Sequence, residues 1–232
     1  MAFKLVISAG HYLETPGKRC LKSLDPTETR EWWLNNRIAD KLEKILAEYD
    51  GIEILRVDDT TGKKEVTLKE RTDKANKWGA DFYLSIHHNA GINGGNGGGI
   101  VIFVYTNPQK ASLEWQRALY NATVKATGLK GNRATPLARK NLHEVRETRM
   151  AACLCEMGFM DSATDVPVIL TEEYADKVAE AMAEVVIEKS GATKKQTPHY
   201  RVQVGSFRKK EYAEAMLKRL KAAGFEAYIT TQ

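Results

Sequence analysis

Four side chains that can bind a metal ion or move a proton stand where predicted strands or helices begin or end: His11, Glu31, His87 and Glu156. Two imidazoles and one carboxylate form the ligand set of a catalytic zinc ion, which keeps a fourth position open for water. Zinc lowers the pKa of that water to about 7, so hydroxide is available at neutral pH. A further carboxylate, Glu156, is placed to take the proton of the water and return it to a leaving amine. These residue types therefore predict metal-dependent hydrolysis.

Each of these residues also has an ordinary structural interpretation. A histidine at the end of a strand is often a half-buried hydrogen-bonding residue, and Glu31, in the first turn of a helix, can simply complement the helix dipole. Glu156 can be paired with Arg146, although a carboxylate that ends an apolar strand is costly to bury without a partner or a role. His88 follows His87 directly, and successive strand residues point to opposite faces, so only one of the two is expected to reach a metal ion.

The elements that must position these residues alternate between strand and helix patterns. Strands are expected at 3–8, 52–57, 82–86, 100–105 and 151–155, with a short one at 142–146. Helices are expected at 29–49, 68–78, 112–127 and 172–189, with a short one before Thr171. Such alternation predicts an α/β fold with a twisted, mostly parallel sheet that helices cover on both faces. Residues that follow the strands lie where open α/β sheets bind their ligands.

The composition is that of a globular protein with one ordinary domain and a small addition. The 232 residues are 43% hydrophobic and 28% charged, and no window approaches the roughly 18 apolar residues of a membrane span. The N-terminal apolar run is too short for a signal peptide and is typical of a first strand, so synthesis in the cytoplasm is expected. Three cysteines, Cys20, Cys153 and Cys155, are too few for a disulfide framework or a cysteine-rich metal site.

The C-terminal segment differs from the rest in charge and pattern. Residues 194–232 hold nine Lys or Arg against three Glu, a net charge of +6, which leaves −1 for the remainder of the chain. We expect a domain at 1–190, a linker at 191–199 and a module at 200–232 with a strand at 200–207, a helix at 209–223 and a strand at 225–230. A basic module indicates an anionic or polymeric partner. Nucleic acid is not expected, because no aromatic-interleaved basic stripe is present.

Local motifs around the four residues strengthen the hydrolase interpretation. In chain order they are Val6-Ile-Ser-Ala-Gly-His11, Glu31 with Asn35 and Ile38-Ala39, Leu68-Lys-Glu-Arg71 with Ala75-Asn76, Ser85-Ile-His-His-Asn-Ala90 and Glu156-Met-Gly-Phe159. This series, over roughly residues 2–188, resembles the zinc-dependent N-acetylmuramoyl-L-alanine amidases of bacterial and phage cell-wall lysis.

The resemblance implies a fold, a reaction and a set of roles. It implies a six-stranded twisted sheet, one zinc ion per chain held by His11, Glu31 and His87, and Glu156 as the catalytic glutamate. The implied reaction is hydrolysis of the amide bond between the lactyl group of N-acetylmuramic acid and the L-alanine of the stem peptide. Asn89, His143 and Arg146 are expected to contact the substrate.

The C-terminal module resembles half of a sporulation-related repeat (SPOR) domain, a family that binds the glycan strands of peptidoglycan. The resemblance rests on Tyr200-Arg-Val-Gln-Val-Gly-Ser-Phe207, on 213–220 and on Gly224-Phe-Glu-Ala-Tyr-Ile229. Gln203, Ser206 and Phe207 are the expected glycan contacts. A complete module has two such repeats, so we expect either weak binding by the half module or a homodimer that completes one sheet.

Two further expectations concern the biological role. The loop Thr15-Pro-Gly-Lys-Arg19 and the stretch Arg30-Glu31-Trp32 resemble the phage endolysin branch, which predicts a bacteriolytic enzyme released through a holin pore. Release when a sporulating cell lyses is the alternative. The sequence leaves open two other functions, a catalytically inactive wall-binding protein and a zinc carboxypeptidase or endopeptidase that cuts elsewhere in the stem peptide.

Overall fold

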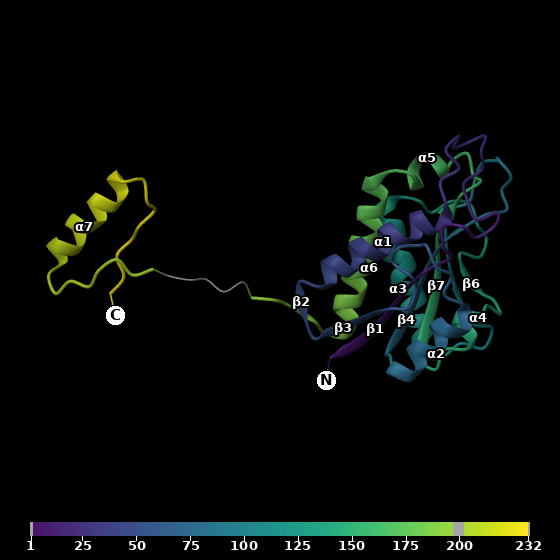
Figure 1. The fold of residues 1–232 in the computed structure, drawn as a ribbon, viewed down its shortest axis with the longest axis horizontal. Helices are drawn as coiled ribbons and strands as arrows, with labels where there is room; N and C mark the ends of the chain where they lie inside the picture. Colours follow the sequence, from purple (N-terminus) through teal and green to yellow (C-terminus); the bar gives the residue numbers. More distant parts are fainter. Residues whose placement is uncertain (1, 197–201, 232) are drawn as a thin grey trace. The chain divides into compact units, whose positions relative to one another are not determined.

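The computed structural model describes residues 2–196 and 202–231, and the chain divides into two units after Lys195. The first unit is built on a six-stranded sheet of order β3-β1-β4-β7-β5-β6 (Figure 1). Its strands are β1 (Phe3–Ala9), β3 (Ile52–Arg56), β4 (Phe82–Asn89), β5 (Ile100–Val104), β6 (Leu137–Arg139) and β7 (Ala151–Phe159). Its helices are α1 (Glu31–Leu46), α2 (Leu68–Trp78), α3 (Lys110–Thr127), α4 (His143–Arg146), α5 (Val166–Ile169) and α6 (Glu172–Ser190).

The sheet is mostly parallel, as the sequence predicted. β1, β4 and β7 lie side by side and run in the same direction, whereas β5 is antiparallel to β7. Parallel neighbours bring their carboxyl ends to one edge of the sheet, which is where ligands bind in open α/β folds. The three strands that carry or precede His11, His87 and Glu156 therefore end together.

Helices cover both faces of the sheet because side chains alternate along each strand. Leu5 and Ile7 of β1 belong to the larger apolar cluster, which includes residues of α1, α3 and α6. Val6, between them, points to the other face and packs with Ala75 of α2 and Val145 of α4. Figure 1 shows these two layers of helices around the sheet. Both faces of the central strands are thus buried, which explains their nearly continuous apolar composition.

Helix α2 shows how local sequence fixes an element near the site. Thr67 and Glu70 form a capping box, in which each side chain accepts a hydrogen bond from the backbone N–H of the other residue. Gly79 ends the helix in the left-handed conformation, which glycine adopts without strain. The helix between these two signals carries Arg71, whose side chain is buried against the sheet.

The structure corrects one part of the predicted order. Residues 143–146 form the short helix α4 and not a strand, while the sixth strand is β6, in a segment where no strand was expected. β6 pairs with β5 through Leu137, opposite Ile102, at the edge of the sheet. A three-residue edge strand has no alternating apolar pattern, so its pairing partner alone makes it a strand.

The C-terminal segment also differs from expectation. Within the predicted linker, β8 (Thr193–Lys194) pairs with β2 (Tyr49–Asp50) in the first unit. In the second unit α7 (Lys210–Ala222) forms as predicted, but the described residues 202–207 and 225–231 contain no strand. Residues 200 and 201 of the first predicted strand lie outside the described residues. A single βαβ repeat offers few neighbours for its backbone groups, so the strand pattern alone does not produce a sheet.

One measurement follows from the packing of α1. Leu42 is fully buried in the larger cluster, whereas Lys44, two residues later, is exposed. We expect Leu42→Ala to lower the free energy of unfolding by about 2–5 kcal/mol, because the truncation leaves a cavity between α1 and the sheet. Lys44→Ala should change it by less than about 0.5 kcal/mol. Urea denaturation of the two variants and the parent chain tests this, and equal midpoints for all three would contradict the packing.

Candidate metal centre and catalytic glutamate

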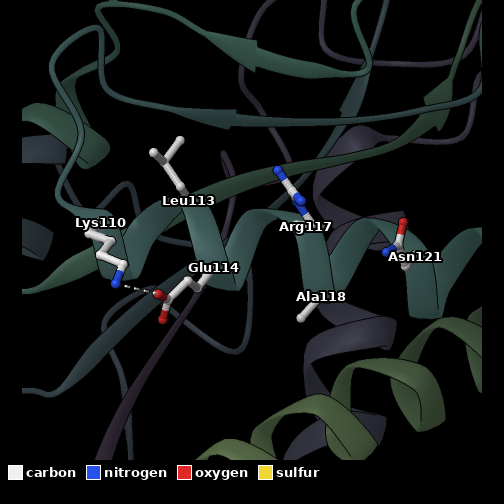
Figure 2. A pocket seen from close by; sticks show the side chains of 6 residues that line it. All are labelled: Lys110, Leu113, Glu114, Arg117, Ala118 and Asn121. Carbon is white, nitrogen blue, oxygen red and sulfur yellow. Dashed lines mark ion pairs between the residues drawn. The ribbon is translucent and has the colours of Figure 1, made fainter.

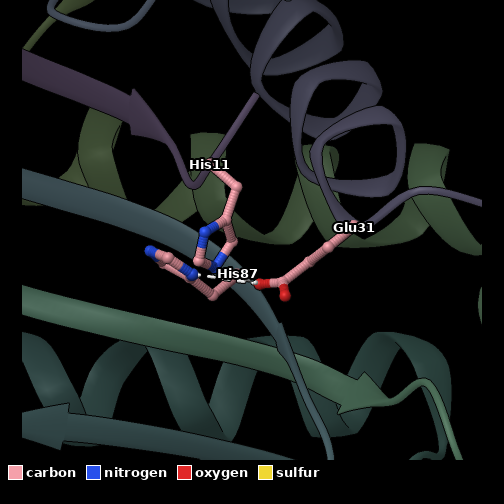
Figure 3. Close-up of side chains that lie close together, drawn as sticks. All are labelled: His11, Glu31 and His87. Atoms are coloured by element: carbon pink, nitrogen blue, oxygen red, sulfur yellow. Dashed lines mark hydrogen bonds and ion pairs between the residues drawn. The ribbon is translucent and has the colours of Figure 1, made fainter. Parts of the chain in front are cut away.

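Three of the predicted site residues converge at the carboxyl edge of the sheet. His11 follows β1, His87 lies near the end of β4, and Glu31 is the first residue of α1. β1 and β4 are paired in parallel, with Ala9 opposite Ile86, so both histidines emerge at the same level. Figure 3 shows the carboxylate of Glu31 directed toward the two imidazoles. The structure thus brings together three residues that are up to 76 positions apart in the sequence.

His11, Glu31 and His87, called the metal cluster below, are spaced to suit a single metal ion. Glu31 Oε1 lies 3.3 Å from His11 Nε2 and 3.1 Å from His87 Nδ1. A tetrahedral zinc ion with bonds of about 2.0 Å separates its ligand atoms by about 3.3 Å. One ligand atom from each residue lies within 4.8 Å of the others, and the two rings meet edge-on at 89°. The donor types and their spacing therefore fit the zinc ligand set implied by the resemblance.

The electrostatics of the cluster also favour a cation. Burial raises the pKa of Glu31, but hydrogen bonds with His11 and His87 outweigh this effect and lower it well below its usual range. Burial lowers the pKa of His87, but Glu144 and Glu31 on its two sides outweigh this and raise it to about 10. A buried imidazole between two carboxylates stabilises a positive charge, whether a proton or a metal ion carries it.

Glu156 lies next to the cluster on β7. It pairs in register with His87 of the neighbouring strand, and paired residues of adjacent strands point to the same face. Its Oε2 atom is enclosed and has no hydrogen-bond partner among the described residues. Burial, which opposes the charged form, is the main cause that raises the pKa of Glu156 to about 7, and the Glu31 carboxylate acts in the same direction. Such a carboxylate can both accept and return a proton near neutral pH.

The sequence left open an ion pair between Glu156 and Arg146, but Arg146 has other partners. Arg146 Nε donates to Glu147 Oε1 at 2.6 Å, and its Nη1 donates to Asn141. In the part of the chain that the structure describes, no ion pair joins Glu156 to a basic residue. Glu156 is thus left facing the metal cluster.

The backbone around His11 is held in an unusual conformation. His11 has a φ of +67°, which is rare for a residue other than glycine. Arg71 of α2 fixes this turn, because its guanidinium donates to the carbonyl oxygens of Ala9 and His11. Gly10 passes so close to the His87 ring that a Cβ at this position would overlap it. The turn between β1 and His11 therefore shapes the metal cluster through its main chain.

His88 points to the opposite face of β4, as strand geometry predicted. It is buried, and its Nδ1 contacts Asn35 Oδ1 of α1 at 2.8 Å. Its backbone N–H donates to Glu31 Oε1, and Asn35 donates to the carbonyl of Gly10. His88 and Asn35 thus hold Glu31 and the His11 turn in place from the α1 side of β4.

The predicted substrate residues form hydrogen bonds with other groups. Asn89 ends β4 and accepts a hydrogen bond from the next backbone N–H, of Ala90. His143 contacts Thr72 of α2 through Nε2, and Arg146 is bound to its own neighbours. Among the described residues, no hydrogen bond links these three side chains to the metal cluster. Their role in substrate binding remains a prediction.

Two residues at the site were given no site role from the sequence, although Lys18 lies in the loop Thr15-Pro-Gly-Lys-Arg19 that carries a family resemblance. Glu144 of α4 is buried beside the His87 ring, with Oε2 3.5 Å from Nε2. Lys18, in the loop before α1, places its ammonium group 3.4 Å from Glu31 Oε2. The local patterns around these residues carry no signal for such roles, because each meets the site only through the tertiary fold.

A separate hollow lies on the surface of α3. Figure 2 shows the side chains that line it. They are Lys110, Leu113, Glu114, Arg117, Ala118 and Asn121. All six belong to one helix and none is a residue of the metal cluster, so this hollow is distinct from the candidate site.

Comparison with known proteins identifies the family. A family model described as N-acetylmuramoyl-L-alanine amidase matches residues 5–188. The chain belongs to this family. The match spans β1 to α6 and so contains all four residues of the candidate centre. A SPOR domain model matches residues 171–232, which include the second unit.

Curated relatives and a solved structure agree with this assignment. The sporulation-specific N-acetylmuramoyl-L-alanine amidase of Bacillus subtilis (strain 168) is 31% identical over 229 residues, which make up 97% of this chain and 84% of the relative. The N-acetylmuramoyl-L-alanine amidase CwlM of Bacillus licheniformis is 30% identical over 80% of this chain and 70% of its own length. The crystal structure of an N-acetylmuramoyl-L-alanine amidase from Clostridium difficile 630 matches with a TM-score of 0.72 and 27% identity, covering 81% of this chain and 96% of that one.

The close approach of Gly10 to the His87 ring leads to a prediction. We expect Gly10→Ala to lower zinc affinity at least about tenfold, because the added methyl group displaces one ligand of the cluster. Competition with a chromophoric chelator measures this affinity. Gly79→Ala is the control, since a Cβ there meets nothing within 4 Å but strains a left-handed backbone. It should cost about 1 kcal/mol of stability and leave zinc affinity unchanged. Unaltered affinity in Gly10→Ala would show that His87 is not a ligand.

Proposed function

We propose that this protein hydrolyses the amide bond between N-acetylmuramic acid and the L-alanine of the stem peptide in peptidoglycan, with a zinc ion bound by His11, Glu31 and His87. The observation that carries the proposal is the convergence of these three ligands beside Glu156. The family assignment and the names of the relatives support the amidase reaction. The spacing of the ligand atoms supports zinc.

The residues of the site have two roles in this reaction, metal binding and proton transfer. A bound zinc ion supplies a Lewis acid that polarises the amide carbonyl and makes water more acidic. Glu156 accepts a proton from the attacking water as its oxygen bonds to the lactyl carbon. It then donates that proton to the alanine nitrogen as the C–N bond breaks. The raised pKa of Glu156, about 7, suits a group that must perform both transfers.

The loop before α1 contributes a positive charge to the same site. The Lys18 ammonium lies on the Glu31 side of the cluster and is partly exposed. Peptidoglycan stem peptides carry carboxylates, which a partly exposed ammonium at the edge of a site can bind. We therefore assign to Lys18 a contact with the stem peptide.

We also propose that the second unit directs the enzyme to the cell wall and pairs with a second copy of itself. Helix α7 buries none of its residues. The unit exposes several large apolar side chains, with Val202 88% and Tyr228 69% exposed. An apolar set of this kind marks an interaction surface, and the pairing of identical units buries it symmetrically. Gln203, Ser206 and Phe207 are exposed, as glycan contacts would need to be.

The biological setting stays a prediction. Release through a holin pore in phage lysis and release when a sporulating cell lyses both deliver the enzyme to the wall from inside the cell. The sporulation-specific relative of Bacillus subtilis is consistent with the second setting. In residues 2–196 and 202–231, no helix is long and apolar enough to span a bilayer.

Digestion of purified peptidoglycan tests the reaction. We expect mass spectrometry to find new amino termini of L-alanine on intact stem peptides. Glu156→Gln should lower the rate at least about a hundredfold, because it removes the general acid–base group, and its zinc content should equal that of the parent chain. A chelator should abolish activity in the parent chain, and added zinc should restore it.

Other outcomes would identify the alternatives. New termini elsewhere in the stem peptide would replace the amidase by a zinc carboxypeptidase or endopeptidase. Wall binding without any product would leave a non-catalytic wall-binding protein. Full activity after removal of all metal would contradict the proposed role of zinc.

Sedimentation equilibrium tests the pairing of the second unit. We expect the full chain to show the mass of a dimer, and Phe225→Asp to shift it toward the monomer, because a charge in the apolar surface opposes burial. Lys221→Ala, also an exposed position of the same unit, should leave the mass unchanged. A monomeric parent chain at concentrations where it still binds cell walls would rule out the dimer.

A further inference from the structure

Glu144 is a buried carboxylate that neither the metal cluster nor the proton transfer uses. It lies on α4, where only 2% of its surface is exposed. Its Oε1 accepts hydrogen bonds from Ser8 Oγ at 2.9 Å and from Tyr83 OH at 2.7 Å, and its Oε2 accepts one from Ser85 Oγ at 3.0 Å. A carboxylate without water is stable only with such donors. Three hydroxyls of β1 and β4 are therefore directed at one side chain.

The remaining neighbour of Glu144 is a ligand of the metal cluster. Oε2 lies 3.5 Å from His87 Nε2, which is buried and forms no hydrogen bond with another described residue. The other ring nitrogen, Nδ1, faces Glu31 and the edge of the His11 ring. The two carboxylates thus lie on opposite sides of one imidazole. A neutral imidazole carries a proton on one nitrogen and offers the other to a metal ion.

We infer that Glu144 is a positioning residue of the metal site, which holds the proton of His87 on Nε2 and so directs the lone pair of Nδ1 toward the metal ion. A carboxylate that faces the non-ligating nitrogen fixes both the tautomer and the orientation of a histidine ligand. The inference rests on the proposed zinc site, and it names the nitrogen of His87 that binds the metal.

The hydrogen bonds of Glu144 extend this support to His11. Ser8 Oγ, which donates to Glu144, accepts a hydrogen bond from Arg71 Nη1. The same guanidinium holds the carbonyl of His11. One connected set of buried polar groups therefore reaches two of the three ligands, the His87 ring through Glu144 and the His11 backbone through Arg71.

An anchoring role for α4 alone is the alternative, and the two roles differ in what they predict. An anchor needs only the hydrogen bonds from Ser8, Tyr83 and Ser85. A positioning residue needs the negative charge opposite His87 Nε2. Glu144→Gln keeps the size of the side chain and removes that charge, whereas Tyr83→Phe removes one hydrogen bond to Oε1 and leaves Oε2 in place.

The test measures zinc affinity and the tautomer of His87 in the full chain. We expect Glu144→Gln to lower zinc affinity about 10–100-fold in competition with a chromophoric chelator, and Tyr83→Phe to lower it much less. In the zinc-loaded parent chain, long-range ¹H–¹⁵N spectra of the imidazoles should show His87 protonated at Nε2. Thermal unfolding of the metal-free variants reports the loss of stability separately.

The zinc affinities of the two variants and the tautomer of His87 each support or overturn the inference. Equal losses of affinity in the two variants would assign Glu144 to anchoring alone and overturn it. A zinc-loaded parent chain with His87 protonated at Nδ1 would also overturn it, and this measurement stands even where Glu144→Gln does not fold. A parent chain that binds no zinc would instead overturn the proposed function, so the two failures are distinguishable.

Discussion

The buried carboxylate of Glu31 is the group on which the rest of the site depends. It is fully enclosed at the start of α1, where water cannot solvate its charge. Its Oε1 atom lies close to the imidazoles of His11 and His87 and accepts a hydrogen bond from the backbone N–H of His88, while the ammonium of Lys18 lies 3.4 Å from its Oε2. An isolated buried carboxylate is strongly unfavourable, so the fold must deliver all of these partners to one point.

The parallel order of β1, β4 and β7 delivers them. Because the three strands end at one edge, the His11 turn, His87 and Glu156 meet the first residue of α1 there. The side chains on the two faces of β4 then contact different supporting groups. Toward α4, Glu144 and its hydroxyl donors face the His87 ring, and toward α1, His88 and Asn35 hold Glu31 and the carbonyl of Gly10. The geometry of the site is thus held by groups on both faces of the sheet.

The second unit differs from the first in how much of its apolar surface is buried. The first unit buries large apolar clusters on each face of its sheet, whereas α7 buries none of its side chains. A single strand–helix–strand repeat is too small to enclose its own apolar residues. Large apolar side chains such as Val202 and Tyr228 therefore stay exposed, and a strand-like sequence pattern is present without a sheet in the described residues.

The sequence by itself determined most of the strand and helix order and singled out the four residues of the candidate centre. Most elements carry a local periodicity, and His11, Glu31, His87 and Glu156 stand in motifs typical of the family. These signals are encoded within a few residues. The prediction was wrong for 142–146 and missed β6, where the local pattern is weak and tertiary contacts decide.

Only the tertiary structure decided how the site is supported. Glu144 meets Ser8 across 136 positions and Tyr83 across 61, and Lys18 meets Glu31 through the path of a loop. No local pattern encodes such contacts, because they depend on which strands become neighbours and which face each side chain takes. The ring nitrogen of His87 that faces Glu31 is determined in the same way. The residue types determine the chemistry that is available, and the order of the strands determines the groups that position it.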